Sequence, residues 1–290
     1  MADISTKSSI HRSDNVLKVV IYIVSIIFSI MTLFPFFLMF INATRSSSEI
    51  QQMAVSFISK HPIQNLIKNW NVFNGKDFHP FTGFVNSFII STGSTILNVY
   101  FSALTAYAIQ AYEWKLRDGF NAMIMAIMMI PGTITTIGFY QAVYKIGLTN
   151  KLFMLIIPAI AAPMTVFFMR QYLQASLSME IVQSARIDGA GEFRIFNQIV
   201  VPLMKPAIAT QAIFGYVASW NQLFMPLILL TKKQKYTLPI MVSLLNGDIY
   251  RTEFGSIYLG LSITVLPLIV VYAFLSRYIV EGVALGGVKS

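Results

Sequence analysis

Six long apolar runs, separated by shorter polar segments, dominate the pattern of this chain. A helix needs roughly 20 residues to cross a hydrocarbon core of about 30 Å. Runs of about this length lie at residues 19–41, 83–110, 120–144, 152–169, 207–230 and 255–276. The pattern predicts an all-α, polytopic membrane protein with six transmembrane helices and no separate soluble domain.

Composition supports this interpretation. Of the 290 residues, 56% are hydrophobic and only 11% are charged, whereas a soluble domain has about 25% charged residues. The first run follows Lys7, Arg12 and Lys18, as a signal peptide would, but it is too long for a signal core and lacks a small-residue cleavage pattern. We expect it to remain as the first span.

The net charge of +9 raises the question of an anionic partner. The basic residues flank the apolar runs and do not share one face with aromatic residues, which favours membrane lipid headgroups and predicts no nucleic-acid partner. A six-span topology divides the 21 Lys and Arg residues eleven to ten between its two sides. The positive-inside rule therefore does not set the orientation.

Several kinds of chemistry are disfavoured by residues that the sequence lacks. There is no cysteine, and the scattered His11, His61 and His79 do not make a metal site. The six runs contain no Asp, Glu, Lys, Arg or His, which argues against a proton relay, although sodium held by backbone oxygens stays open. The G-x-x-x-x-G-K-[ST] loop for ATP is missing. We therefore expect a partner to supply the energy.

Neutral hydrogen-bonding side chains are frequent in the second, third and fifth runs. Combined with aromatic rings they suit a polyhydroxylated ligand such as a sugar, because hydroxyl groups pair with its OH groups and a flat ring stacks on its C–H face. The substrate-path candidates are Asn86, Tyr140, Trp220 and Asn221. The alternative is that such groups only bond and pack between helices.

A charged, glycine-containing segment interrupts the apolar runs between residues 178 and 206. Ser178 is expected to cap a helix that begins at Met179, and Gly189 permits the positive-φ turn that redirects it. A second short helix over 191–200 is predicted to end at Pro202 and Pro206. Its apolar stripe comprises Phe193, Phe196, Ile199 and Val200. This bent pair is either an interfacial helix on lipid headgroups or a docking element for another subunit.

The segment resembles the EAA loop of ATP-binding-cassette (ABC) importer permeases, whose pattern is roughly E-A-A-x-x-x-G followed by I-x-L-P. Residues 183–189 read QSARIDG, and residues 199–202 read IVVP. The stretches LMKPA, SWNQLFMPLILL, YTLPI and GVALGGVKS also resemble the carbohydrate branch of that family. The resemblance covers almost the whole chain and is strongest to the smaller permease of maltose-type importers.

The resemblance implies an orientation and a domain plan. The coupling loop, 177–206, is cytoplasmic, so both termini are cytoplasmic, in a bacterial or archaeal cytoplasmic membrane. Residues 1–18 form a cytoplasmic N-terminal segment and residues 19–290 a six-span permease domain.

In this family the short helix of the EAA loop fits a cleft on the ATPase and carries its closure into the membrane. The residues expected to couple to the ATPase are Gln183, Ser184, Ala185, Asp188, Gly189, Ala190, Phe193, Phe196 and Pro202. Phe193 and Phe196 are expected to brace the helix against the permease core. Gln183 and Ser184 replace the family's glutamate and first alanine, which removes a salt bridge, and docking is expected to persist on apolar contacts.

The external loop, 231–254, matches a family loop that in the maltose system probes the sugar cleft of the binding protein. Leu244, Asn246 and Gly247 are its contact candidates, and the alternative is an ordinary connecting loop. The tail 286–290 aligns with a segment that reaches the ATPase interface.

The resemblance thus predicts one of two homologous membrane subunits of a binding-protein-dependent oligosaccharide importer. The chain itself is not expected to be an enzyme or to hold a cofactor, since ATP and Mg belong to a separate ATPase dimer. The expected partners are the second permease subunit, that ATPase, an extracytoplasmic sugar-binding protein, an oligosaccharide and membrane lipid. The alternatives are a permease for a non-sugar solute and a structural or signalling membrane subunit.

Overall fold

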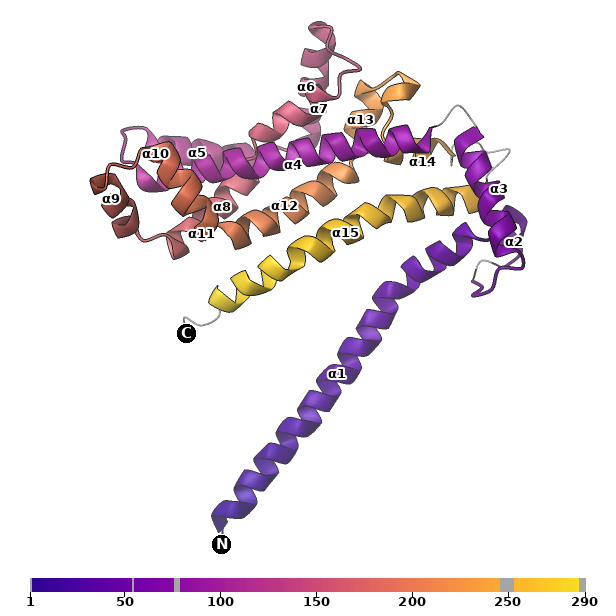
Figure 1. The fold of residues 1–290 in the computed structure, drawn as a ribbon, viewed down its shortest axis with the longest axis horizontal. Helices are drawn as coiled ribbons and strands as arrows, with labels where there is room; N and C mark the ends of the chain where they lie inside the picture. Colours follow the sequence, from indigo (N-terminus) through magenta and orange to yellow (C-terminus); the bar gives the residue numbers. More distant parts are fainter. Residues whose placement is uncertain (1, 54, 76–78, 246–252, 287–290) are drawn as a thin grey trace. The chain divides into compact units, whose positions relative to one another are not determined.

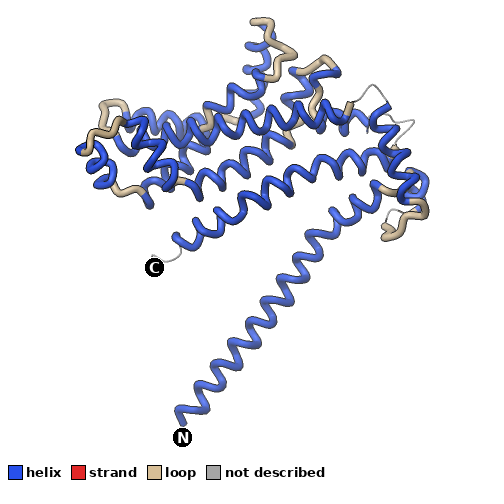
Figure 2. Tube along the Cα trace, in the orientation of Figure 1, coloured by secondary structure: helices blue, strands red, loops and turns tan. Residues whose placement is uncertain are grey.

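The computed structural model describes residues 2–53, 55–75, 79–245 and 253–286, and their regular structure is entirely helical (Figures 1 and 2). The first helices are α1 (Ala2–Ala43), α2 (Ser47–Gln52), α3 (Pro62–Gly75), α4 (Pro80–Ala111), α5 (Arg117–Met128), α6 (Gly132–Lys145) and α7 (Phe153–Ile156). They are followed by α8 (Pro163–Ser176), α9 (Met179–Ile187), α10 (Glu192–Ile195), α11 (Val201–Leu203), α12 (Lys205–Trp220), α13 (Phe224–Leu229), α14 (Leu238–Leu245) and α15 (Phe254–Gly286). The all-α class is confirmed for the described residues.

The chain forms two compact units. The first comprises residues 1–73 with 248–262, and the second comprises 74–247 with 263–290. In the first unit, a capping box of Ser46 and Glu49 starts α2 directly after α1. Arg45, only 2% exposed, donates to the side-chain oxygen of Asn42 and to the carbonyls of Glu49 and Met53 at 2.7–2.8 Å. These bonds fix the turn between α1 and α2.

Gly255, at the start of α15, lies against this turn. A Cβ at this position would sit 2.5 Å from the carbonyl oxygen of Arg45 and 2.5 Å from the side chain of Asn69. We expect Gly255→Ala to destabilise the protein by about 1–3 kcal/mol, because neither the backbone nor the bonded amide can move away freely. Thermal unfolding in detergent measures this. Gly138→Ala in α6, where a Cβ meets nothing within 4 Å, is the matched control, and equal melting temperatures would contradict the assignment.

In the second unit, α4 is the central helix and packs along α8 and α12 (Figure 1). Small residues on α4 allow the close approach, as in other membrane helix pairs. The buried small residues of α4 include Ser87, Ser91, Ser94, Ser102, Ala103 and Ala106. A hydrophobic core joins one end of α4 to α8, α9 and the segment around Phe196. This core supports the charged segment singled out in the sequence.

Within the described residues, four segments are long and apolar enough to cross a membrane: Leu17–Ala43, Pro80–Ala111, Phe153–Ser176 and Phe254–Arg277. A fifth is counted if Glu192–Leu203 and Lys205–Trp220, which meet at 79°, form one broken span. The structure thus gives four or five candidate spans by length and composition, and six remains a prediction.

The predicted third and fifth spans are interrupted in the structure. The third divides into α5 and α6 around Pro131, because a proline has no N–H to donate and restricts the residue before it to extended conformations. The fifth stops at Trp220 and resumes as α13. Length and hydropathy located these segments but not their breaks.

Candidate functional site

The charged segment folds locally as two short helices joined by a glycine turn. The Ser178 hydroxyl accepts from the backbone N–H of Glu180 at 3.3 Å and caps α9, which begins at Met179. Gly189 has φ +76°, and Gly191 is the N-cap of α10. The predicted cap, helix start and turn are confirmed.

The predicted apolar stripe of the second helix is only partly right. Phe196 and Val200 are fully buried and Ile199 is half-buried, but Phe193 is 68% exposed and Ile195 is buried instead. The helix continues from α10 as a π-helical turn, Phe196–Val200. The buried side of this helix is formed by Ile195 and Ile199 and by Phe196 and Val200, pairs four residues apart, and Phe193 lies off that side. Phe193 therefore does not brace the helix against the core.

The two prolines lie where the prediction has them. The helix that begins at Glu192 runs through the π turn to Leu203, so it ends directly after Pro202. Pro206 lies in the first turn of α12, where a missing N–H costs nothing. Pro202 is exposed at the 79° bend.

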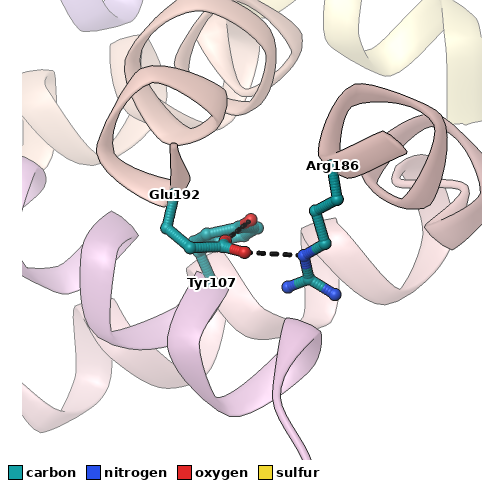
Figure 3. A network of polar contacts seen from close by, with 3 residues as sticks. All are labelled: Tyr107, Arg186 and Glu192. Carbon is teal, nitrogen blue, oxygen red and sulfur yellow. Dashed lines mark hydrogen bonds and ion pairs between the residues drawn. The ribbon is translucent and has the colours of Figure 1, made fainter. Parts of the chain in front are cut away.

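A single carboxylate ties the segment to α4 (Figure 3). The side chain of Glu192, at the start of α10, accepts from Nε of Arg186 in α9 at 2.6 Å and from the hydroxyl of Tyr107 in α4 at 3.0 Å. Tyr107 is 2% exposed, and its ring lies 5.7 Å from that of Phe196. The Arg186 guanidinium lies 5.3 Å from the centre of the Tyr112 ring. Three helices thus meet at Glu192, which the sequence reasoning did not single out.

The electrostatics of this network favour the charged carboxylate. The hydrogen bond from Arg186 lowers the pKa of the Glu192 carboxyl, so the pair stabilises the loop at neutral pH and loses this contribution as acidification protonates the carboxylate. The two side chains are 34% and 39% exposed. Water therefore weakens the attraction, and the pair acts mainly by fixing the angle between α9 and α10.

The two faces of α9 differ sharply. Val182 and Ala185 are buried against the core. On the other side Ile187 is 87% exposed and Ile181 47%, with Gln183, Ser184 and Asp188 also exposed. Among the other predicted coupling residues, Gly189 is exposed, Ala190 is half-buried and Phe196 lies in the core. The exposed side of α9 with Phe193, which we call the α9 face, combines the apolar side chains of Ile181, Ile187 and Phe193 with polar ones, and the described residues do not cover it.

The substrate-path candidates are not brought together around one cavity. The amide nitrogen of Asn86 donates to the carbonyls of Gln234 and Tyr236 at 3.0 Å. Trp220 is 1% exposed, and its Nε1 donates to the carbonyl of Thr264 at 2.9 Å. Asn221 is exposed at the end of α12, and Tyr140 is half-buried with its ring near that of Tyr144. The contacts of Asn86 and Trp220 therefore fit the alternative in which these side chains only bond and pack within the protein.

A cavity of about 540 Å³ lies instead between α4, α6, α12 and the α7 region. Its polar lining consists of Ser94, Asn98, Thr135, Thr136, Ser219 and Gln222, and no charged residue of the described ranges lines it. These residues belong to the neutral groups that the sequence showed in the spans. The sequence does not distinguish these residues from their polar neighbours, because the packing of the helices determines which side chains line the cavity.

The external-loop candidates are partly outside the described residues. Leu244, at the end of α14, is 40% exposed, while Asn246 and Gly247 fall outside the ranges that the structure describes.

Comparison with known proteins gives a consistent result. Residues 98–284 match the family described as "Binding-protein-dependent transport system inner membrane component". The chain is 30% identical to the arabinooligosaccharides transport system permease protein AraQ of Bacillus subtilis (strain 168), over 95% of this chain and 97% of that protein. It is 33% identical to AraQ of Halalkalibacterium halodurans, over 88% and 91%.

Among solved structures, the chain shares its fold with a chain of a bacterial ABC transporter involved in the import of the acidic polysaccharide alginate. The TM-score is 0.77 at 23% identity, covering 92% of this chain and 98% of that one.

Proposed function

Because this chain belongs to the family of binding-protein-dependent transport system inner membrane components, we propose that it is one of two homologous membrane subunits of an ATP-driven oligosaccharide importer. It is a multi-pass membrane protein and a transport subunit, not an enzyme, and ATP hydrolysis belongs to a separate subunit. The observation that carries the coupling role is the α9 face. A helix surface outside the spans that exposes isoleucines and packs on a core with its other side suits a groove on a partner protein.

The proposed topology has six spans. The two segments α5 and α6 together form the third span, and α12 with α13 forms the fifth; a break is tolerated where neighbouring helices or a cavity satisfy the freed backbone groups. With the coupling loop 177–206 in the cytoplasm, both termini are cytoplasmic and the loop 231–254 is external. The host is a bacterial or archaeal cell with this permease in its cytoplasmic membrane.

The coupling residues fall into two groups in this proposal. Gln183, Ser184, Asp188 and Gly189 would lie at the ATPase surface, with the exposed Phe193 beside them. Ala185, Ala190, Phe196 and Pro202 would hold that surface to the permease. Because Gln183 is neutral where the family has glutamate, docking depends on apolar contact, which exposed isoleucines on the α9 face provide.

Transmission would run through Glu192. When the ATPase dimer closes on its ATP and Mg, α9 moves with it. The Arg186–Glu192–Tyr107 contacts then pass the displacement to α4, the central helix of the second unit. The permease pair exposes its cavity to the opposite side, and ATP hydrolysis on the partner resets it. The cycle uses the different affinities of two conformations.

The cavity chemistry supports a neutral, hydroxyl-rich solute. Its amide and hydroxyl groups can pair with sugar hydroxyls, whereas a phosphorylated solute would require a cation that this lining lacks. Relatives that transport arabinooligosaccharides point the same way. We place the substrate path along this cavity, where Tyr140 and Asn221 are sequence neighbours of the lining residues Phe139 and Gln222, and keep Leu244, Asn246 and Gly247 as contacts for the sugar-binding protein.

Reconstitution of the whole transporter tests this function. The chain, its partner permease and the ATPase are placed in nanodiscs, and ATP hydrolysis is measured with the cognate binding protein loaded with neutral oligosaccharides, beginning with arabino-oligosaccharides. We expect a several-fold stimulation that depends on the loaded binding protein. Unchanged hydrolysis with every loaded form would contradict the importer role and favour a structural or signalling subunit.

A further inference from the structure

One side of the helix α3, in the first unit, is apolar and exposed. Its members recur at the positions i, i+3, i+4 and i+7, which share one face of an α-helix. They are Ile63, Leu66, Ile67 and Trp70. We call this face the α3 stripe. The exposed polar residues Gln64 and Asn71 lie on another side of the same helix, so the exposed surface of α3 is amphipathic.

Hydrogen bonds hold α3 at the end of α1. The buried side-chain nitrogen of Asn69 donates to the carbonyls of Ala43 and Arg45 at 2.9 and 3.0 Å. Ala43 is the last residue both of α1 and of its apolar segment, Leu17–Ala43. The ring of the buried Phe73 lies 6.5 Å from that of Trp70. The helix α3 is therefore fixed where a span formed by α1 leaves the hydrocarbon.

The segment before α3 folds back along α1. The ring of Phe57 lies 6.2 Å from that of Phe34 and 6.0 Å from that of Phe37. Phe37 precedes the end of α1 by six residues, about 9 Å along a helix axis, so Phe57 lies beside the apolar part of the span. The Ser59 hydroxyl donates to the carbonyl of Thr44 at 2.6 Å, which brings the chain back to the end of α1 just before α3 begins.

The exposed apolar surface of α1 thus continues onto this segment. Phe57 and Ile58 are exposed, as are Phe34 and Phe37 beside them. An exposed apolar patch of this kind marks a protein partner or a membrane. Lipid already surrounds a span at the depth of Phe57, and the bonds of Asn69 and Ser59 keep α3 from moving away from the end of that span. The position of α3 therefore favours lipid as its partner.

We propose that α3 is an interfacial helix whose stripe lies in the bilayer, at the boundary between headgroups and acyl chains, with Phe57 deeper beside α1. Trp70 suits this place, because a tryptophan ring is favoured at the headgroup level. A helix of this kind buries its apolar face about 5–10 Å into that boundary. It would resist displacement of α1 along the membrane normal. The inference needs only that α1 spans the membrane; the proposed topology adds that the leaflet is the outer one.

Site-directed spin labelling tests the position of the stripe, and the chain has no cysteine of its own to interfere. Nitroxide labels are attached at Ile63→Cys or Ile67→Cys in the complete transporter, with cysteine-free partner subunits, in phosphatidylcholine nanodiscs. Collision with oxygen, which concentrates among acyl chains, is compared with collision with a water-soluble nickel chelate. We expect oxygen to be favoured about threefold or more at both positions, as it is for groups below the headgroups. Labels at Gln64→Cys and Asn71→Cys, on the polar side of the same helix, should favour the nickel chelate.

Two other outcomes would overturn the inference. Labels on the stripe that neither reagent reaches would show that a protein subunit covers it, and labels reached mainly by the nickel chelate would place it in water. Tryptophan fluorescence gives a second measurement without a cysteine: brominated phosphatidylcholine should quench a component that Trp70→Phe removes, and equal quenching of both proteins would contradict lipid contact. Neither measurement uses sugar or ATP, so its result is independent of the transport function.

Discussion

Replacing Gly189 with proline is expected to separate the permease from its ATPase. Gly189 has φ +76°, whereas a proline ring holds φ near −65°. The substitution also removes the N–H that donates to the carbonyl of Arg186 at 3.0 Å. The turn between α9 and α10 cannot form with proline, so the α9 face would no longer be presented to its partner. We expect co-purification with the ATPase to be lost.

A second glycine offers a matched control two residues away. Gly191 has φ −67° and ψ 152°, which proline adopts without strain. Gly191→Pro should therefore keep the ATPase bound, although the two variants make the same chemical change in the same turn. Gly189→Ala should lie between them, since a left-handed conformation costs an alanine about 1–2 kcal/mol and no neighbour blocks its Cβ. Wild-type co-purification of Gly189→Pro would refute the coupling role of this turn.

Features that depend on one or two residues could be predicted from the sequence. The Ser178 cap and the Gly189 turn follow from side-chain chemistry and glycine sterics, and the structure has both. The approximate positions of the apolar segments followed from length and hydropathy. Breaks at Pro131 and after Trp220 did not, because proline and polar residues occur in continuous membrane helices as well.

Features that depend on packing could not be predicted. Ile195 faces the core and Phe193 does not, although both are apolar and lie two residues apart, and the π turn at Phe196–Val200 was not predicted either. The sequence alone does not tell whether Trp220 and Asn86 bind a ligand or stabilise the fold. Their hydrogen-bond partners decide this: Trp220 donates to the carbonyl of Thr264, and Asn86 donates to the carbonyls of Gln234 and Tyr236. The contact between Tyr107 and Glu192 joins residues 85 positions apart, so the sequence does not indicate it either.

Reversing the charges of the Arg186–Glu192 pair is expected to show that the pair transmits motion. Glu192→Arg alone sets two guanidinium groups against each other and removes the acceptor of the Tyr107 hydroxyl. We expect ATP hydrolysis stimulated by the loaded binding protein to fall by about tenfold, the effect of losing a coupled contact. The ATPase should still co-purify, because the α9 face is unchanged.

The double variant Arg186→Glu/Glu192→Arg supplies the decisive comparison. It rebuilds the ion pair in reverse, and the Tyr107 hydroxyl can accept from an arginine as readily as it donates to a carboxylate. Stimulated hydrolysis should therefore recover to within about threefold of wild type, far above the product of the two single effects. The exposed pair Arg117–Asp118, 3.4 Å apart, is the control, and its reversal should change nothing measurable. If the double variant instead loses stimulated hydrolysis by the product of the two single losses, Arg186 and Glu192 act independently. Motion would then have to reach α4 through the apolar contact of Phe196 with Tyr107.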